Sequence, residues 1–133
     1  MAGILSLLRL WWVQVLLVFV ASRIVTTALV LIQAASQVAS PWAGAGPDYV
    51  AFASFWDAEW YLRIVALGYP TELPVDDQGM LQENAWAFMP AYPWLVAALS
   101  WVTGAPFQVW AVIVAVACAA GASLAFYRLF VTW

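Results

Sequence analysis

The longest apolar stretch, residues 10–35, constrains the fold more than any other feature of this sequence. It reads LWWVQVLLVFVASRIVTTALVLIQAA, and Arg23 is its only charged residue. As an α-helix it would be about 39 Å long, which exceeds the ~30 Å hydrocarbon core of a bilayer. Charged residues make up 8% of the 133 residues, whereas soluble domains average about 25%. The predicted fold class is therefore an all-α integral membrane protein.

A cleavable secretory signal is the alternative for this first stretch, because Arg9 precedes it. The apolar part of a signal peptide is about 7 to 15 residues long. The run in this chain is longer and is interrupted by Arg23. A membrane helix over residues 10–35 is the favoured interpretation.

Two further apolar stretches, residues 88–103 and 106–131, are separated by Gly104 and Pro106. Glycine followed closely by proline is typical of a helix that stops and a second helix that begins. We therefore predict one membrane domain, residues 1–133, with about three transmembrane helices. Residues 36–87 would form an external loop that contains an interfacial helix at about 54–67.

The charges are distributed unevenly along the chain. All seven acidic residues lie between residues 48 and 83, together with Arg63, so this segment carries a net charge of −6. The chain has no lysine and no run of basic residues, so it lacks the basic patch that is typical of nucleic-acid-binding proteins. The expected partner is the lipid bilayer.

Arg9 next to the amino terminus predicts a cytoplasmic start and an external or luminal acidic segment. The membrane would be a plasma membrane of the bacterial type or that of the endoplasmic reticulum. Three crossings would then place Arg128 outside as well, against the positive-inside tendency. Partial insertion of residues 88–103 is the alternative that would avoid this.

The interfacial helix is predicted from its ends and from one apolar face. Ser54 would be its N-cap, and Gly68 lies where a left-handed residue ends many helices. Four apolar residues share one face at helical spacing: Trp56, Trp60, Ile64 and Leu67. Such a face suits a helix that lies on the membrane surface.

Two acidic residues of this helix have different expected roles. Glu59 and Arg63 are four residues apart in the favourable order and should form a surface ion pair. Asp57 could complete a capping box with Ser54. Alternatively, Trp56 and Trp60 could partly desolvate its carboxylate at the lipid boundary, which would suit a general base.

A stretch rich in aromatic residues, ENAWAFMPAYPWL (residues 83–95), leads into the second apolar segment. Pro90 and Pro93 would keep the chain extended and then allow a helix to begin at Pro93. This stretch could be an interface anchor. It could also form one wall of a cavity that faces Asp57.

Arg23 lies near the middle of the first predicted crossing. An arginine there costs about 2.5 to 3.5 kcal/mol on insertion scales, so it should face protein, water or a lipid phosphate. None of the three apolar segments contains an acidic residue. Its partner would come from further helices, another subunit or a lipid headgroup.

The chain has two aromatic stretches, FWDAEWYLRIVALGYP (residues 55–70) and ENAWAFMPAYPWL (residues 83–95). In this order, they resemble the amino-terminal signature of the PIG-V-like mannosyltransferases. These are relatives of GPI mannosyltransferase II, within the GT-C class of polytopic glycosyltransferases. The family pattern is an aromatic–Asp pair, an aromatic-rich helix ending in Gly-Tyr, and Glu before Ala-Phe-x-Pro-x-x-Pro. The matching residues are Trp56, Asp57, Tyr61, Gly68, Tyr69, Glu83, Ala87, Phe88, Pro90, Tyr92 and Pro93.

The resemblance implies an inverting transfer of mannose from a polyprenyl-phosphate donor to a hydroxyl acceptor, with Asp57 as general base. The other substrate contacts would be Glu59, Trp60, Tyr61, Arg63, Glu83, Phe88, Tyr92 and Arg23. Asp57 and Glu59 could also hold a divalent cation, and no other cofactor is implied. The chain would form the amino-terminal third of a GT-C fold and could be inactive without the remaining helices.

A noncatalytic membrane subunit is the second functional hypothesis. Its aromatic loop would pack against a partner, and Arg23 would pair with an acidic residue of that partner.

Overall fold

The computed structural model describes residues 10–39 and 44–133. These residues form helices joined by loops, and the β-structure among them is an isolated bridge between Val75 and Leu81. The predicted all-α class is confirmed for this part of the chain. Arg9, which supported the predicted orientation, lies outside the described residues.

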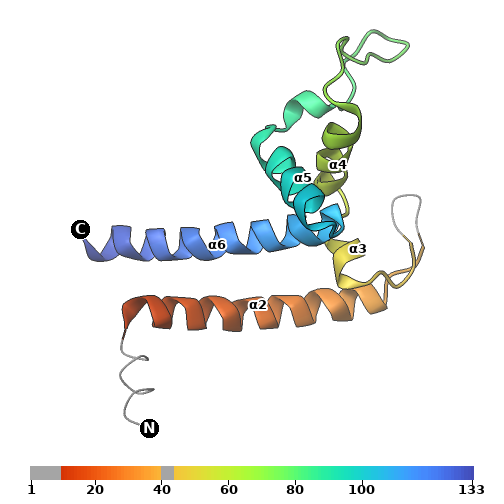
Figure 1. Ribbon diagram of the computed structural model, residues 1–133. Helices are drawn as coiled ribbons and strands as arrows, with labels where there is room; N and C mark the ends of the chain where they lie inside the picture. The colour runs from red at the N-terminus through yellow and green to blue at the C-terminus, as the bar shows by residue number, and fades with distance from the viewer. Residues whose placement is uncertain (1–9, 40–43) are drawn as a thin grey trace.

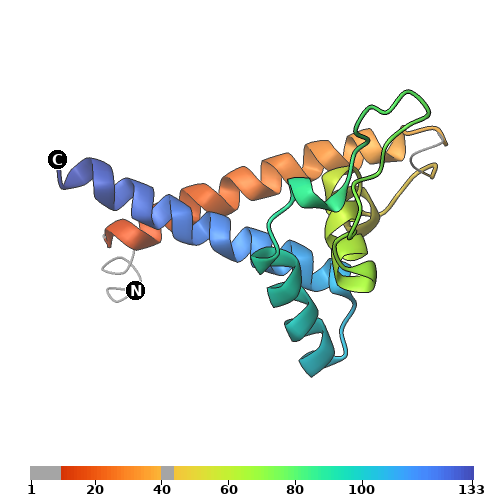
Figure 2. The same cartoon turned by 90° about the horizontal axis from the view of Figure 1, so that it is seen from above.

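Two long helices, α2 (Trp11–Ala35) and α6 (Phe107–Val131), run antiparallel to one another (Figures 1 and 2). Each has 25 residues and is long and apolar enough to cross a membrane. The Trp11 ring stacks on Tyr127 with a centroid distance of 5.6 Å, and the Arg128 guanidinium lies 5.2 Å from the Trp11 ring centre. The beginning of α2 therefore meets the end of α6.

The surfaces of α2 and α6 are unlike those of helices in a soluble core. Ala34 is the one buried residue that the structure describes in α2, and Val114 is its counterpart in α6. Large apolar side chains such as Val18 and Ile24 are 72% and 65% exposed. Extended apolar surfaces of this kind mark contact with a membrane or with other proteins. Both helices are thus suited to a lipid environment.

The shorter helices gather at the end of this pair where α2 finishes and α6 starts (Figure 1). They are α3 (Tyr49–Ala53), α4 (Asp57–Leu67), the 3₁₀ turn η1 (Ala85–Ala87) and α5 (Ala91–Thr103). Helix α3 contacts both long helices, α4 packs on α5 and η1, and α5 packs on α6. The largest fully buried side chains among the described residues, Ile64, Val96 and Pro93, belong to these helices.

Helix α5 has 13 residues and is therefore about 20 Å long, shorter than the ~30 Å hydrocarbon core. Gly104 ends it in the left-handed conformation with φ 72°, which agrees with the predicted helix stop. Its start is at Ala91 rather than at the predicted Pro93, because a proline is tolerated anywhere in the first helical turn. The predicted third crossing is not confirmed.

The predicted interfacial helix is corrected in two respects. Helix α4 begins at Asp57, and Ser54 instead ends α3, where its hydroxyl donates to the Val50 carbonyl at 2.7 Å. Ile64 is buried while Trp56 and Leu67 are both 83% exposed, so the predicted apolar face is not one continuous surface. The reason is that α4 packs on α5 and η1, which the spacing of one helix cannot reveal.

We expect single cysteines at Gln78 and Thr132, in a Cys118→Ser background, to react with a membrane-impermeant thiol reagent from opposite sides. Gln78 lies in the exposed loop beyond α4, and Thr132 follows the last residue of α6, beside the start of α2. The measurement is labelling of sealed vesicles, with permeabilised vesicles as the control for reactivity. Labelling of both positions from one side would indicate three crossings and contradict the antiparallel pair as the membrane-spanning unit.

Candidate functional site

The chain makes a strained turn immediately before α4. Trp56 has φ 60° and ψ −126°, close to the first central position of a type II′ turn. The Ala58 N–H donates to the Phe55 carbonyl at 3.3 Å and closes this turn. Glycine is the usual residue in such a conformation, and other residues there cost on the order of 1 to 3 kcal/mol.

Asp57 directly follows this turn and is the first residue of α4. Its carboxylate is exposed and has no hydrogen-bond or ion-pair partner among the described residues. The predicted capping box with Ser54 is therefore wrong, because Ser54 belongs to the preceding helix. A carboxylate in the first turn of a helix also interacts favourably with the helix dipole.

Glu59 and Arg63 form the predicted ion pair. The Arg63 Nη2 atom lies 2.6 Å from Glu59 Oε1, and both side chains are at least half exposed. The Arg63 guanidinium also lies 5.0 Å from the centre of the Trp60 ring. Exposed pairs of this kind contribute a few tenths of a kcal/mol.

The two aromatic stretches of the sequence meet in space as one cluster. The Phe88 ring stacks on Trp60 at 6.0 Å and makes an edge contact with Tyr61 at 5.5 Å. Tyr61 makes a second edge contact with Tyr92, with ring centres 4.9 Å apart. These edge contacts contribute beyond simple burial of area.

Hydrogen bonds hold the same two stretches together beyond the rings. The Tyr69 hydroxyl donates to the Phe88 carbonyl at 2.8 Å, and the Trp86 indole N–H donates to the Pro70 carbonyl at 2.9 Å. The rings of Tyr69 and Trp86 lie 4.5 Å apart. Residues 83–95 therefore form a wall that packs against the end of the stretch at residues 55–70.

A cavity of about 360 Å³ lies below this cluster, between α2, α3, α4, α5 and the first half of α6. Its α6 face is made of small and branched apolar residues: Ala111, Val112, Ala115, Val116 and Ala119. Polar groups come from the other helices and from the start of α6: Arg23, Tyr49, Ser54, Glu59, Tyr61, Tyr92 and Gln108. The cavity is thus apolar along one side and polar at several separate points.

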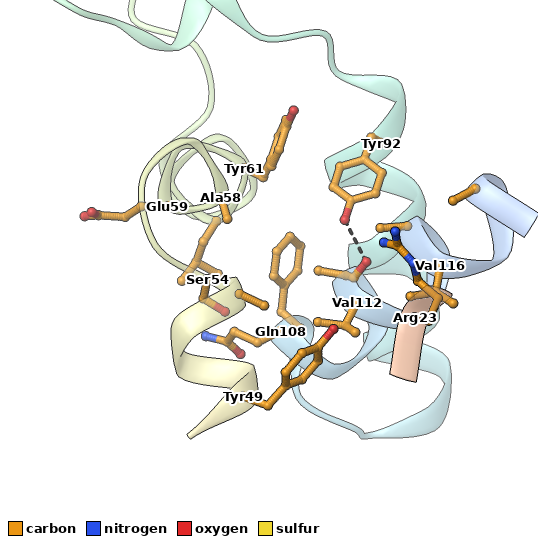
Figure 3. A pocket seen from close by; sticks show the side chains of 16 residues that line it. Arg23, Tyr49, Ser54, Ala58, Glu59, Tyr61, Tyr92, Gln108, Val112 and Val116 are labelled. Atoms are coloured by element: carbon orange, nitrogen blue, oxygen red, sulfur yellow. Dashed lines mark hydrogen bonds between the residues drawn. The ribbon is translucent and has the colours of Figure 1, made fainter. Parts of the chain in front are cut away.

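The charged groups of the lining are oriented differently (Figure 3). The Glu59 carboxylate points away from the cavity and is bound by Arg63. The Arg23 guanidinium lies on the side of the cavity where Tyr92 is found. The interior is consequently more attractive to an anion than to a cation.

Tyr92 connects α5 to α6. Its hydroxyl donates to the Ala111 carbonyl at 2.7 Å. Burial raises the pKa of this hydroxyl above its usual value, with smaller contributions from Tyr61 and Cys118. Tyr92 therefore remains a neutral donor and serves as a structural contact rather than as a base.

The structure brings together some of the predicted site residues and leaves others outside. Four of them line the cavity: Arg23, Glu59, Tyr61 and Tyr92. Five do not: Asp57, Trp60, Arg63, Glu83 and Phe88. Of these five, Trp60 and Phe88 support the wall, while Glu83 is exposed in the loop before η1.

Sequence reasoning missed Tyr49 and Gln108, which both line the cavity. Asp48 caps α3 by accepting the Ala51 N–H at 2.8 Å, and this Asp before a short apolar run could have predicted the helix that carries Tyr49. Nothing in the local pattern distinguishes Gln108 from an ordinary helix-start residue.

A metal site at Asp57 and Glu59 would have few protein ligands. Within residues 10–39 and 44–133, no group of three or more acidic, histidine or cysteine side chains lies close enough to hold an ion. Glu59 is also engaged by Arg63. A cation bound there would depend on oxygens from a substrate or from outside these residues.

The strained turn predicts an unusual order of stabilities. We expect Trp56→Gly to be more stable than Trp56→Ala by about 1 kcal/mol, because glycine adopts a positive φ without strain. Both variants lose the same exposed ring, and thermal unfolding in detergent measures the difference. Trp101, 87% exposed on α5, is the matched control, where alanine should be the more stable variant. Equal or reversed stabilities at position 56 would contradict the strain.

Comparison of the chain with protein families, with curated proteins and with solved structures finds no match. The resemblance of the two aromatic stretches between residues 55 and 95 to the PIG-V-like mannosyltransferases therefore stays a prediction.

Proposed function

We propose that this chain is the amino-terminal part of a mannosyltransferase that uses a polyprenyl-phosphate-linked mannose at the external or luminal face of a membrane. The observation that carries the proposal is the packing of the two signature stretches against each other. Residues from both stretches form the aromatic cluster, and Tyr61 and Tyr92 from this cluster also line the cavity.

The position of the cavity supports a lipid-linked substrate. The cavity is bordered by α2 and the first half of α6, the two helices able to cross a membrane. The cavity therefore lies at the same end of the α2–α6 pair as the acidic segment. A donor with a hydrocarbon chain could keep that chain in lipid while its sugar reaches the polar segment.

In this reaction the acceptor hydroxyl loses its proton to a carboxylate as its oxygen attacks the anomeric carbon of mannose. The bond between that carbon and the phosphate oxygen breaks, and polyprenyl phosphate leaves with the bonding electrons. The sugar is transferred with inversion. General-base assistance of this kind is worth about 10² to 10⁴ in rate.

Asp57 is the carboxylate that we assign to proton removal. It precedes Ala58, which lines the cavity, so it is placed beside the lining rather than within it. Its freedom from other partners among the described residues leaves its oxygens available. The strained Trp56 before it supports a functional role, because strain of this kind concentrates at functional sites.

The second candidate function is a noncatalytic membrane subunit. The observation in its favour is Arg23, which has no acidic partner among the described residues and could pair with a carboxylate of another protein. This candidate predicts a stable stoichiometric complex. It also predicts that the carboxylate of Asp57 is dispensable.

We expect Asp57→Asn to lower mannose transfer at least about 100-fold while the protein still inserts into membranes. The assay measures transfer of labelled mannose from a polyprenyl-phosphate donor in membranes of cells that express the chain in its native coding frame. Asp77→Asn is the matched control, since Asp77 is an exposed acid in the loop beyond α4. Undiminished transfer by Asp57→Asn would remove Asp57 from the role of base and favour the subunit.

A further inference from the structure

Arg23 occupies an unusual position in the fold. It is the central residue of α2, with twelve helical residues on either side. A guanidinium at this depth requires a counter-charge, water or a route to the membrane surface. Its surroundings should therefore reveal what it binds.

No charged partner of Arg23 is found in residues 10–39 and 44–133. Its recorded side-chain contact is with the Phe19 ring, 5.6 Å from the guanidinium carbon to the ring centre. The one ion pair of the described chain is that of Glu59 and Arg63. Arg23 therefore presents an unneutralised positive charge.

This charge borders the cavity instead of facing only lipid. Arg23 comes from α2, while Tyr49 of α3 and Gln108 of α6 line the same cavity. The Tyr49 hydroxyl and the Gln108 amide have no hydrogen-bond partner within the described residues. Figure 3 shows the Tyr49 hydroxyl directed toward Val112, whereas the Gln108 amide points toward Ser54 and away from Arg23. Of these two free polar groups, Tyr49 is therefore the one on the Arg23 side of the cavity.

We propose that Arg23 binds the phosphate group of a membrane lipid in this cavity, with Tyr49 as an additional hydrogen-bond donor. Guanidinium is well matched to phosphate oxygens, because it presents several N–H donors in one plane. The lipid chain would follow the face of α6 at Ala115 and Ala119, where small side chains leave room. The guanidinium lies over Phe19, one turn before Arg23 in α2, so the phosphate would enter the cavity to reach it.

A phosphate lipid explains the surroundings better than a carboxylate from another helix. Both a carboxylate and a phosphate can accept hydrogen bonds from Arg23 and Tyr49. The small apolar residues on the α6 face match the hydrocarbon chain of a lipid, which a carboxylate side chain does not bring into the cavity.

The inference deepens the proposed function, because a polyprenyl-phosphate donor is one possible source of this phosphate and an anionic phospholipid is the other. It assigns the phosphate to Arg23 of α2, whereas the proposed base, Asp57, is the first residue of α4. The binding itself can be measured without any transfer reaction.

The test measures lipid retention by the purified full chain in detergent, using native mass spectrometry. The probes are a polyprenyl monophosphate, the uncharged polyprenol of equal length, and phosphatidylglycerol. We expect the wild type to retain the polyprenyl phosphate at least tenfold more tightly than the polyprenol. Arg23→Gln should lose this preference, and Arg23→Lys should keep part of it.

Arg128→Gln is the matched control, because Arg128 lies at the far end of α6 over Trp11. It should retain the lipid as the wild type does. A melting curve for each variant separates loss of binding from loss of folding. Stronger retention of polyprenyl phosphate than of phosphatidylglycerol assigns the site to the donor, and equal retention assigns it to bulk anionic lipid.

Equal binding of polyprenol and polyprenyl phosphate by the wild type would overturn the inference. So would undiminished phosphate preference in a folded Arg23→Gln variant. A site that binds phosphate lipids in membranes that transfer no mannose would uphold this inference and reject the proposed function.

Discussion

The antiparallel packing of α2 against α6 is the constraint on which the rest of the structure depends. Stacking of Trp11 on Tyr127 fixes one end of the pair. The chain between the two helices must consequently leave and return at the other end, and all the short helices collect there. This arrangement places the acidic segment, the aromatic cluster and the cavity on one side of the molecule.

Among the short helices, aromatic contacts provide the stabilisation that a large apolar core provides in a soluble domain. Few side chains are fully buried, but rings from α4 and from the stretch before α5 contact each other repeatedly. Hydrogen bonds from Tyr69 and Trp86 to backbone carbonyls add direction to these contacts. The result is a packed aromatic wall beside a cavity that remains open.

Much of the helical organisation could be predicted from the sequence, because long apolar runs and the Gly104 stop are local signals. The Glu59–Arg63 pair was predictable for the same reason. The end of α3 at Ser54 and the burial of Ile64 were not, since both depend on how α3 and α4 pack on distant helices. The turn immediately before Asp57 was not predictable either, because a positive φ is not expected of a tryptophan.

The alanines at positions 111, 115 and 119 have a consequence for how the cavity could change. They recur on one face of a continuous helix, so the width of the space is determined by missing side-chain atoms and not by a bend in the backbone. A bulkier residue at any one of these positions would narrow the cavity and leave the contacts of the aromatic cluster in place. Single substitutions could therefore change the width of the ligand that the cavity accepts without changing the fold.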